Sequence, residues 1–72
     1  MSLIFPNSTA IQEISNVAEN QVTVTWKSGS SYTYILSNPD KFIMDLNEVV
    51  SSSASVGSFV NSQIQQNMMQ LV

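Results

Sequence analysis

The sequence predicts an α+β fold in which a three-stranded antiparallel β-meander is followed by two α-helices packed on one face of the sheet. Polar and apolar residues alternate in the first half of the chain, whereas apolar residues recur every three or four positions in the second half. The connections between these segments are short, which favours neighbouring antiparallel strands. Seventy-two residues make a single domain, 1–72, with its core over roughly residues 8–68.

Three segments have the composition of β-strands. The first is expected over residues 8–17, where Ile11 and Ile14 do not share parity, so either a β-bulge intervenes or one of them points outward. The second, over residues 21–27, alternates β-branched and aromatic residues with polar ones and is the clearest strand signal in the chain. After the break at Ser28–Ser30, residues 31–36 form the third strand.

The register of the hairpin between the last two strands depends on the turn around Gly29, the residue there that accepts a positive φ at low cost. A two-residue turn, Ser28–Gly29, would leave both tyrosines on the face of the threonines. A three-residue loop that starts at Lys27 instead gathers six large apolar side chains on one face: Val22, Val24, Trp26, Tyr32, Tyr34 and Leu36. We favour the second register, because burying two aromatic rings outweighs most turn preferences. It predicts that both tyrosines lie inward, beneath the helices.

The second half of the chain predicts two helices. Asn38 is a candidate N-cap and Pro39 suits the first helical position, so the first helix is expected from residue 39 to about 51. A second helix is expected from residue 57 or 58 to the C-terminus. In that helix Met68 would lie on the buried stripe, and Met69 would lie about 100° away on the surface.

Charge is sparse in this chain and argues against binding to nucleic acid. Only 10% of residues are charged, against about 25% in a typical protein, and two lysines with five acidic residues give a net charge of −3. Such a chain offers roughly two or three cationic contacts to a phosphate backbone. No secretory signal and no membrane-spanning run is recognised, so a cytoplasmic protein is expected. The Ser/Asn/Gln-rich composition suits a small phage or bacterial protein.

The residue types needed for catalysis or metal binding are scarce. The chain has no histidine and no cysteine, so we expect no catalytic residues, no zinc site, no cofactor and no disulfide. Asp45 and Glu48 are spaced three apart on the first predicted helix and are interpreted as solvated charges. The hydroxyl-rich run Ser51–Ser58 is interpreted as helix capping, with anion binding as the alternative. Stability must come from apolar packing, helped by self-association.

Two linked motifs carry a resemblance to a known family. Tyr32-x-Tyr34 follows a Trp-x-x-Gly hairpin, and a Ser-x-Gly-x-Phe-x-Asn-x-x-Ile pattern runs from Ser55 to Ile64. With these motifs the chain resembles the KTSC domain, a family named after the C-terminal segment of some lysyl-tRNA synthetases. The resemblance covers Ser8 to Met68. Its matching positions are Ser8, Ile11, Val22, Val24, Trp26, Gly29, Tyr32, Tyr34, Ser55, Gly57, Phe59, Asn61 and Ile64.

The resemblance implies a small domain without an assigned activity, for which RNA binding has been suggested because of the synthetase context. Basic residues common in the family near the hairpin and after the Asn-x-x-Ile segment are Ser, Thr and Gln here. Position 65, an arginine site in the family, is Gln65. These departures remove the charge that RNA binding needs.

Two functional hypotheses follow, and neither is an enzyme. The first is a non-enzymatic KTSC-like interaction module that contacts another protein, or a second copy of itself through Met69, Leu71 and Val72 with the nearby Leu3–Phe5. The alternative is a weak RNA-binding accessory domain, in which Trp26, Tyr32 and Tyr34 stack on bases and Lys27 supplies charge.

Overall fold

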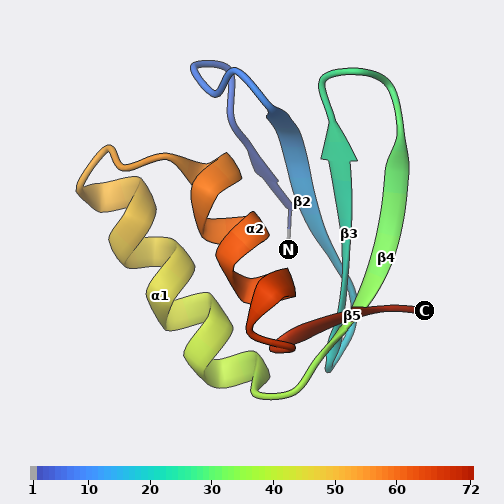
Figure 1. Ribbon diagram of the computed structural model, residues 1–72. Helices are drawn as coiled ribbons and strands as arrows, with labels where there is room; N and C mark the ends of the chain where they lie inside the picture. The colour runs from blue at the N-terminus through green and yellow to red at the C-terminus, as the bar shows by residue number, and fades with distance from the viewer. Residues whose placement is uncertain (1) are drawn as a thin grey trace.

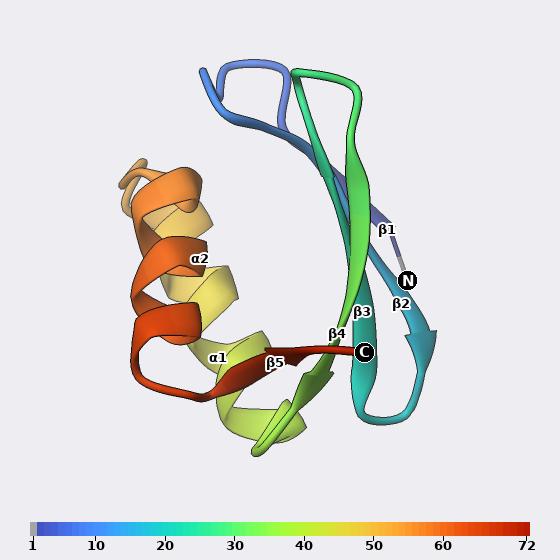
Figure 2. The same cartoon turned by 45° about the vertical axis from the view of Figure 1, so that its right-hand side comes forward.

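A five-stranded antiparallel sheet with two helices on one face makes up the part of the chain that the computed structural model describes, Ser2 to Val72 (Figure 1). The elements in chain order are β1 (Ser2–Ile4), β2 (Ile11–Ala18), β3 (Gln21–Trp26), β4 (Ser31–Leu36), α1 (Pro39–Ser51), α2 (Val56–Gln65) and β5 (Met69–Leu71). The strands lie in the order β1-β2-β3-β4-β5, and Figure 2 shows both helices on one side of them. The α+β class and the antiparallel meander are confirmed, but the sheet has five strands instead of three.

The β3–β4 hairpin has the register that segregates apolar from polar side chains. Val24 pairs with Tyr32 and Val22 pairs with Tyr34, as the three-residue loop predicts. The Trp26 N–H donates to the Ser30 carbonyl at 2.8 Å, and Gly29 has a φ of 103°. Glycine is the residue that adopts this conformation without steric cost, which is how a single residue determines which face of the hairpin is buried.

A β-bulge near the start of β2 resolves the parity conflict in the sequence. The pairing of β2 with β3 shifts between Ile11 and Glu13, so one extra residue is accommodated on β2. As a result Ile11 and Ile14 are both buried. The strand starts at Ile11 instead of residue 8, because the Ser8 hydroxyl oxygen accepts the Ile11 N–H at 3.1 Å and holds the preceding residues in a turn.

Side-chain caps start both helices where the sequence places polar residues. The Asn38 side-chain oxygen accepts the Lys41 N–H at 3.2 Å, and α1 runs over Pro39–Ser51 as predicted. The Ser55 hydroxyl does the same for the Ser58 N–H at 3.2 Å, which begins α2 at Val56. The capping interpretation of the serine-rich segment is therefore correct for Ser55.

The predicted helix to the C-terminus is wrong beyond Gln65. Asn67 adopts a left-handed conformation with a φ of 60°, and two hydrogen bonds close a Schellman motif over the helix end. In that motif the Met68 N–H donates to the Gln63 carbonyl at 2.9 Å, and the Asn67 N–H donates to the Ile64 carbonyl at 3.1 Å. The chain then continues as β5, which pairs with β4. Because residues 69–71 form a strand instead of a helix, the burial of the two methionines differs from the prediction: Met69 is buried and Met68 is half-buried.

The core lies between the sheet and the helices and is made of aliphatic and aromatic side chains. The aromatic rings of Phe42 on α1 and Phe59 on α2 pack with their centroids 5.5 Å apart. Gly57 allows α2 to approach the start of β2, since a Cβ there would lie 3.1 Å from the Ala10 Cβ. The buried hydrophobic residues are Phe5, Ile11, Ile14, Val22, Val24, Tyr34, Leu36, Phe42, Leu46, Val56, Val60 and Met69.

None of the helices found in residues 2–72 has the length and apolar character required to cross a membrane.

Candidate functional site

The two tyrosines of β4 point to the same face of the sheet but have different environments. Tyr34 is 8% exposed and belongs to the core, whereas Tyr32 is 46% exposed. Tyr32 lies one residue from the start of β4, and the tip of the β3–β4 hairpin extends past the ends of both helices in Figures 1 and 2. The expectation that both rings lie beneath the helices is therefore correct for Tyr34 and wrong for Tyr32, because the helical layer ends before it reaches Tyr32.

The β3–β4 register puts Trp26 on the same face of the sheet as the two tyrosines. Burial raises the pKa of the Tyr34 phenol, and the negative charge that Tyr32 would carry raises that pKa further. The Trp26 side chain acts in the opposite direction and lowers this pKa. Trp26 is itself half-buried. The structure thus places Trp26, Tyr32 and Tyr34 on one face of the sheet, but it leaves only Tyr32 well exposed.

The raised pKa of Tyr34 predicts a loss of stability at high pH. A phenol that ionises less readily in the folded state than in the unfolded state contributes no penalty below its ordinary pKa of about 10. Above that pH the unfolded state releases its proton first, so the free energy of unfolding falls as the pH rises through the folded-state pKa. Urea titrations between about pH 8 and pH 11.5 are expected to show this decline, and Tyr34→Phe is expected to reduce it. An equally steep decline in Tyr34→Phe would contradict the assignment.

Lys27 does not complete a cationic binding platform. Its ammonium group donates to the Pro6 carbonyl at 3.0 Å, which ties the hairpin loop to the segment after β1. The side chain is exposed and remains accessible. One lysine with a backbone partner is a small electrostatic contribution to phosphate binding.

The residues predicted for self-association divide into a buried and an exposed group. Met69 is 1% exposed and lies in the core opposite Leu36. The prediction that Met69 is a surface contact is therefore wrong. Leu71 is 60% exposed, and Val72 is also exposed. Of the nearby N-terminal residues, Phe5 is buried and Ile4 is exposed on the opposite edge of the sheet.

Exposed apolar side chains gather on the two strands at the β5 edge. Of the eight large exposed hydrophobic side chains in residues 2–72, four lie on β4, on β5 or directly after β5. We call these four residues the β4–β5 corner: Tyr32, Ile35, Leu71 and Val72. Ile35 was missing from the predicted site, although it is the one apolar residue on the polar face of its strand. That exception to the alternation is the signal that identifies it.

The uncovered face of the sheet is lined by hydroxyl groups. The hydroxyl oxygens of Thr23 and Thr33 lie 2.8 Å apart across the β3–β4 ladder. At the β1 edge Glu13 accepts hydrogen bonds from the hydroxyls of Ser2 and Ser15, and these bonds lower the pKa of its carboxyl group. These side chains satisfy one another, so this face is polar and already hydrogen-bonded.

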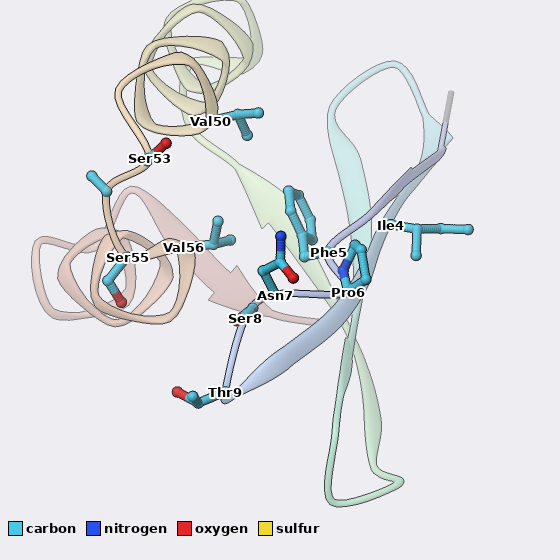
Figure 3. Close-up of a pocket in the computed structure, with 11 residues that line it drawn as sticks. Ile4, Phe5, Pro6, Asn7, Ser8, Thr9, Val50, Ser53, Ser55 and Val56 are labelled. Atoms are coloured by element: carbon cyan, nitrogen blue, oxygen red, sulfur yellow. The ribbon is translucent and has the colours of Figure 1, made fainter.

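One cavity lies between the N-terminal loop and the α1–α2 connection (Figure 3). Its volume is about 490 Å³, and Phe5 and Val56 approach it from opposite sides. The lining contains apolar, hydroxyl and amide side chains and no acidic or basic one: Ile4, Phe5, Pro6, Asn7, Ser8, Thr9, Val50, Ser53, Ala54, Ser55 and Val56. It therefore offers no general base and no charged group to a ligand.

The carboxylates of α1 are on the surface. The Asp45 carboxylate accepts a hydrogen bond from the Lys41 ammonium at 2.7 Å, one helical turn away. No cluster of three or more acidic side chains that could hold a metal ion occurs in residues 2–72. An exposed pair of this kind contributes at most a few tenths of a kcal/mol, about 0.3–0.5 kcal/mol in helices.

Comparison with known proteins provides no relative: no family model, no curated protein and no solved structure matches this chain.

Proposed function

We propose that this chain is a non-enzymatic, KTSC-like domain that acts by contacting another protein through the β4–β5 corner. The observation that carries the proposal is that four of the large exposed apolar side chains lie around one edge of the sheet, Tyr32 and Leu71 on its helix side and Ile35 and Val72 on its other side. Apolar side chains scattered singly over a surface need no explanation, whereas several of them around one edge of a sheet favour an interaction site. Tyrosine is also among the residues that contribute most to protein interfaces.

The absence of charge at this corner favours a protein partner. Neither β4 nor β5 contains an Asp, Glu, Lys or Arg residue. The centres of protein–protein interfaces are depleted in charged residues, whereas surfaces that bind nucleic acid carry Lys and Arg. The uncharged β4–β5 corner therefore resembles the centre of a protein–protein interface more than a surface that binds nucleic acid.

The non-enzymatic part of the proposal rests on the chemistry of the cavity between the N-terminal loop and the α1–α2 connection. Its lining side chains are apolar, hydroxyl or amide groups, and the hydroxyls of Ser8 and Ser55 already accept backbone N–H groups at the starts of β2 and α2. These roles are structural. A serine nucleophile would need a neighbouring base to activate it, and the lining supplies none.

RNA binding, the alternative drawn from the sequence, has less support. Base stacking needs accessible ring faces, and Tyr34 is buried while Trp26 is half-buried. Tyr32 and Lys27 are the two exposed members of the proposed set. One accessible ring and one lysine make a poor site for a polyanion, because the chain as a whole has a net charge of −3.

Site-specific photocrosslinking tests the proposed surface. A photoreactive benzoylphenylalanine is placed at position 32 and, as a matched control, at position 44, where Met44 is exposed on α1. In cells that express the protein, we expect protein adducts at position 32 in clear excess over those at position 44. Equal adduct yields at the two positions, or adducts at position 32 with RNA alone, would contradict the proposal.

A further inference from the structure

The cavity between the N-terminal loop and the α1–α2 connection has the size of a site for a small organic molecule (Figure 3). Its volume is about 490 Å³, and sites of this kind measure about 300–1,000 Å³. Phe5 and Val56 are 8% and 7% exposed and form the buried apolar part of the lining, to which Ile4 and Val50 add exposed apolar surface. Ile4 belongs to β1, so the cavity lies at the opposite edge of the sheet from the β4–β5 corner.

Hydrogen bonds hold the N-terminal wall of the cavity in place. The Phe5 N–H donates to the Gln12 carbonyl at 2.9 Å, which attaches the wall to β2. The Ser8 N–H donates to the Phe5 carbonyl at 3.2 Å and closes a turn. The Lys27 ammonium, which is not part of the lining, donates to the Pro6 carbonyl at 3.0 Å and attaches the same loop to the β3–β4 hairpin.

The wall formed by the α1–α2 connection is also fixed by hydrogen bonds. The Ser53 N–H donates to the Val50 carbonyl at 3.2 Å, and the Ala54 N–H donates to the Val49 carbonyl at 3.0 Å. With Ser53 at a φ of 59°, these two bonds form the Schellman motif that ends α1. Both walls are therefore held in place by the protein itself, which lowers the entropic cost of binding a ligand.

Polar side chains in the lining can orient a ligand. The Asn7 amide and the hydroxyls of Thr9 and Ser53 belong to exposed residues of the lining. Figure 3 shows the Asn7 side chain between Phe5 and Val56. A primary amide has two N–H donors and one carbonyl acceptor, so Asn7 can pair with an amide or hydroxyl group of a ligand.

The cavity has no electrostatic preference for a charged ligand. Its lining contains no acidic or basic side chain. The helix α1 ends at Ser51 and α2 begins at Val56, so the negative end of one helix dipole and the positive end of the other border the same connection and offset each other. A charged group that entered would lose hydration without gaining a counter-ion, whereas an uncharged ligand avoids this cost.

We propose that this cavity is a binding site for a small uncharged molecule that combines an apolar ring with an amide or hydroxyl group. The ring lies against Phe5 and Val56, and the polar group bonds to the Asn7 amide. Because the lining supplies no general base, the ligand is bound and not converted. The site is separate from the β4–β5 corner, so it goes beyond the proposed contact with a protein partner.

Three probes of nearly identical shape test the proposed ligand class. Benzamide is uncharged, benzoate is an anion and benzamidinium is a cation, and each joins a phenyl ring to a small planar group. Each probe is titrated to about 10 mM at about 0.15 M salt, which screens distant carboxylates, and backbone amide signals are followed by NMR. We expect benzamide to bind with a Kd of about 1 mM and each charged probe to bind at least about tenfold more weakly.

The amide signals that shift identify the site. We expect benzamide to shift signals within residues 7–9 and 53–56 and to leave those of Tyr32 and Leu71 unchanged. Val50→Trp fills the cavity, so it should fold, as judged by circular dichroism, and lose the shifts. Met44→Trp is the matched control, because Met44 is exposed on the same helix and is not part of the lining. It should bind benzamide as the wild type does.

A second pair of variants tests the polar contact. Asn7→Leu removes the amide at nearly unchanged size and should weaken benzamide binding about fivefold. Asn47→Leu makes the same change at an exposed position on α1 and should leave binding unchanged. If Val50→Trp does not fold, this pair decides.

Several outcomes would overturn the proposed site. They are no amide shift up to about 10 mM benzamide, shifts confined to residues away from the cavity, and equal affinities for the three probes. A folded Val50→Trp or an Asn7→Leu variant that binds benzamide as tightly as the wild type would overturn it as well. The photocrosslinking at position 32 is independent of these measurements, so the failure of the ligand site and the failure of the proposed function are distinguishable.

Discussion

Replacing Tyr34 by alanine is expected to lower the free energy of unfolding by about 3–5 kcal/mol, the range for truncation of large buried aromatic side chains. Tyr34 is buried between the sheet and the helices, opposite Val22. A domain of 72 residues has a total stability of about 4–11 kcal/mol, so this one change removes a large part of it. Urea titration followed by circular dichroism measures the loss.

Tyr32→Ala is the matched control for this prediction. Both residues are tyrosines on the same strand and the same face, and they differ in whether the helices cover them. Because Tyr32 is nearly half exposed, its truncation is expected to cost about 1 kcal/mol or less. If the two variants lost equal stability, or if Tyr32→Ala lost more, the hairpin register or the extent of the helical layer would differ from this structure.

Leu46→Ala is expected to cost about 2–5 kcal/mol. Leu46 is fully buried on α1, and its removal leaves a cavity in the layer between the helices and the sheet. The loss should appear as a lower urea midpoint with little change in the slope of the transition, since the compactness of the folded state is retained.

Met44→Ala serves as the control on the same helix. Met44 is 71% exposed, two residues before Leu46, so this substitution is expected to change the free energy of unfolding by at most about 0.5 kcal/mol. Comparable effects of the two substitutions would mean that the buried face of α1 is not the one containing Leu46.

The parts of the fold that the sequence predicts correctly are those determined by strong local chemistry. Gly29 allows the positive φ of the hairpin loop, and that loop determines the register of β3 against β4. Asn38 and Pro39 start α1 where they stand in the sequence. The parity conflict between Ile11 and Ile14 also has a local cause, a bulge that buries both side chains.

The two outer strands were missed because each has only three residues. Neither Ser2–Ile4 nor Met69–Leu71 is long enough to show an alternating pattern. Residues 66–72 contain Gln, Met and Leu, which favour helices, so the apolar stripe of α2 continues past its actual end. Asn67 was the available signal, since asparagine is the residue after glycine that most often takes the left-handed position ending a helix.

The helix wrongly predicted for residues 66–72 also makes part of the predicted self-association site wrong. With residues 68–72 as a helix, Met69 faces the solvent. As a strand paired with β4, the same segment turns Met69 into the core and leaves Leu71 exposed. The composition of the segment, apolar and without charge, still indicated a contact surface. Which of its side chains are accessible depends on the pairing with Tyr34 and Leu36, which lie more than thirty residues earlier in the chain.

Hydrogen exchange at the Leu71 and Val72 amides tests the placement of β5 against β4 most directly. The Val72 N–H donates to the Thr33 carbonyl, whereas the Leu71 N–H points away from β4. The Leu71 amide should therefore exchange quickly and the Val72 amide more slowly than its unprotected rate. Equally fast exchange at the two amides would contradict the account.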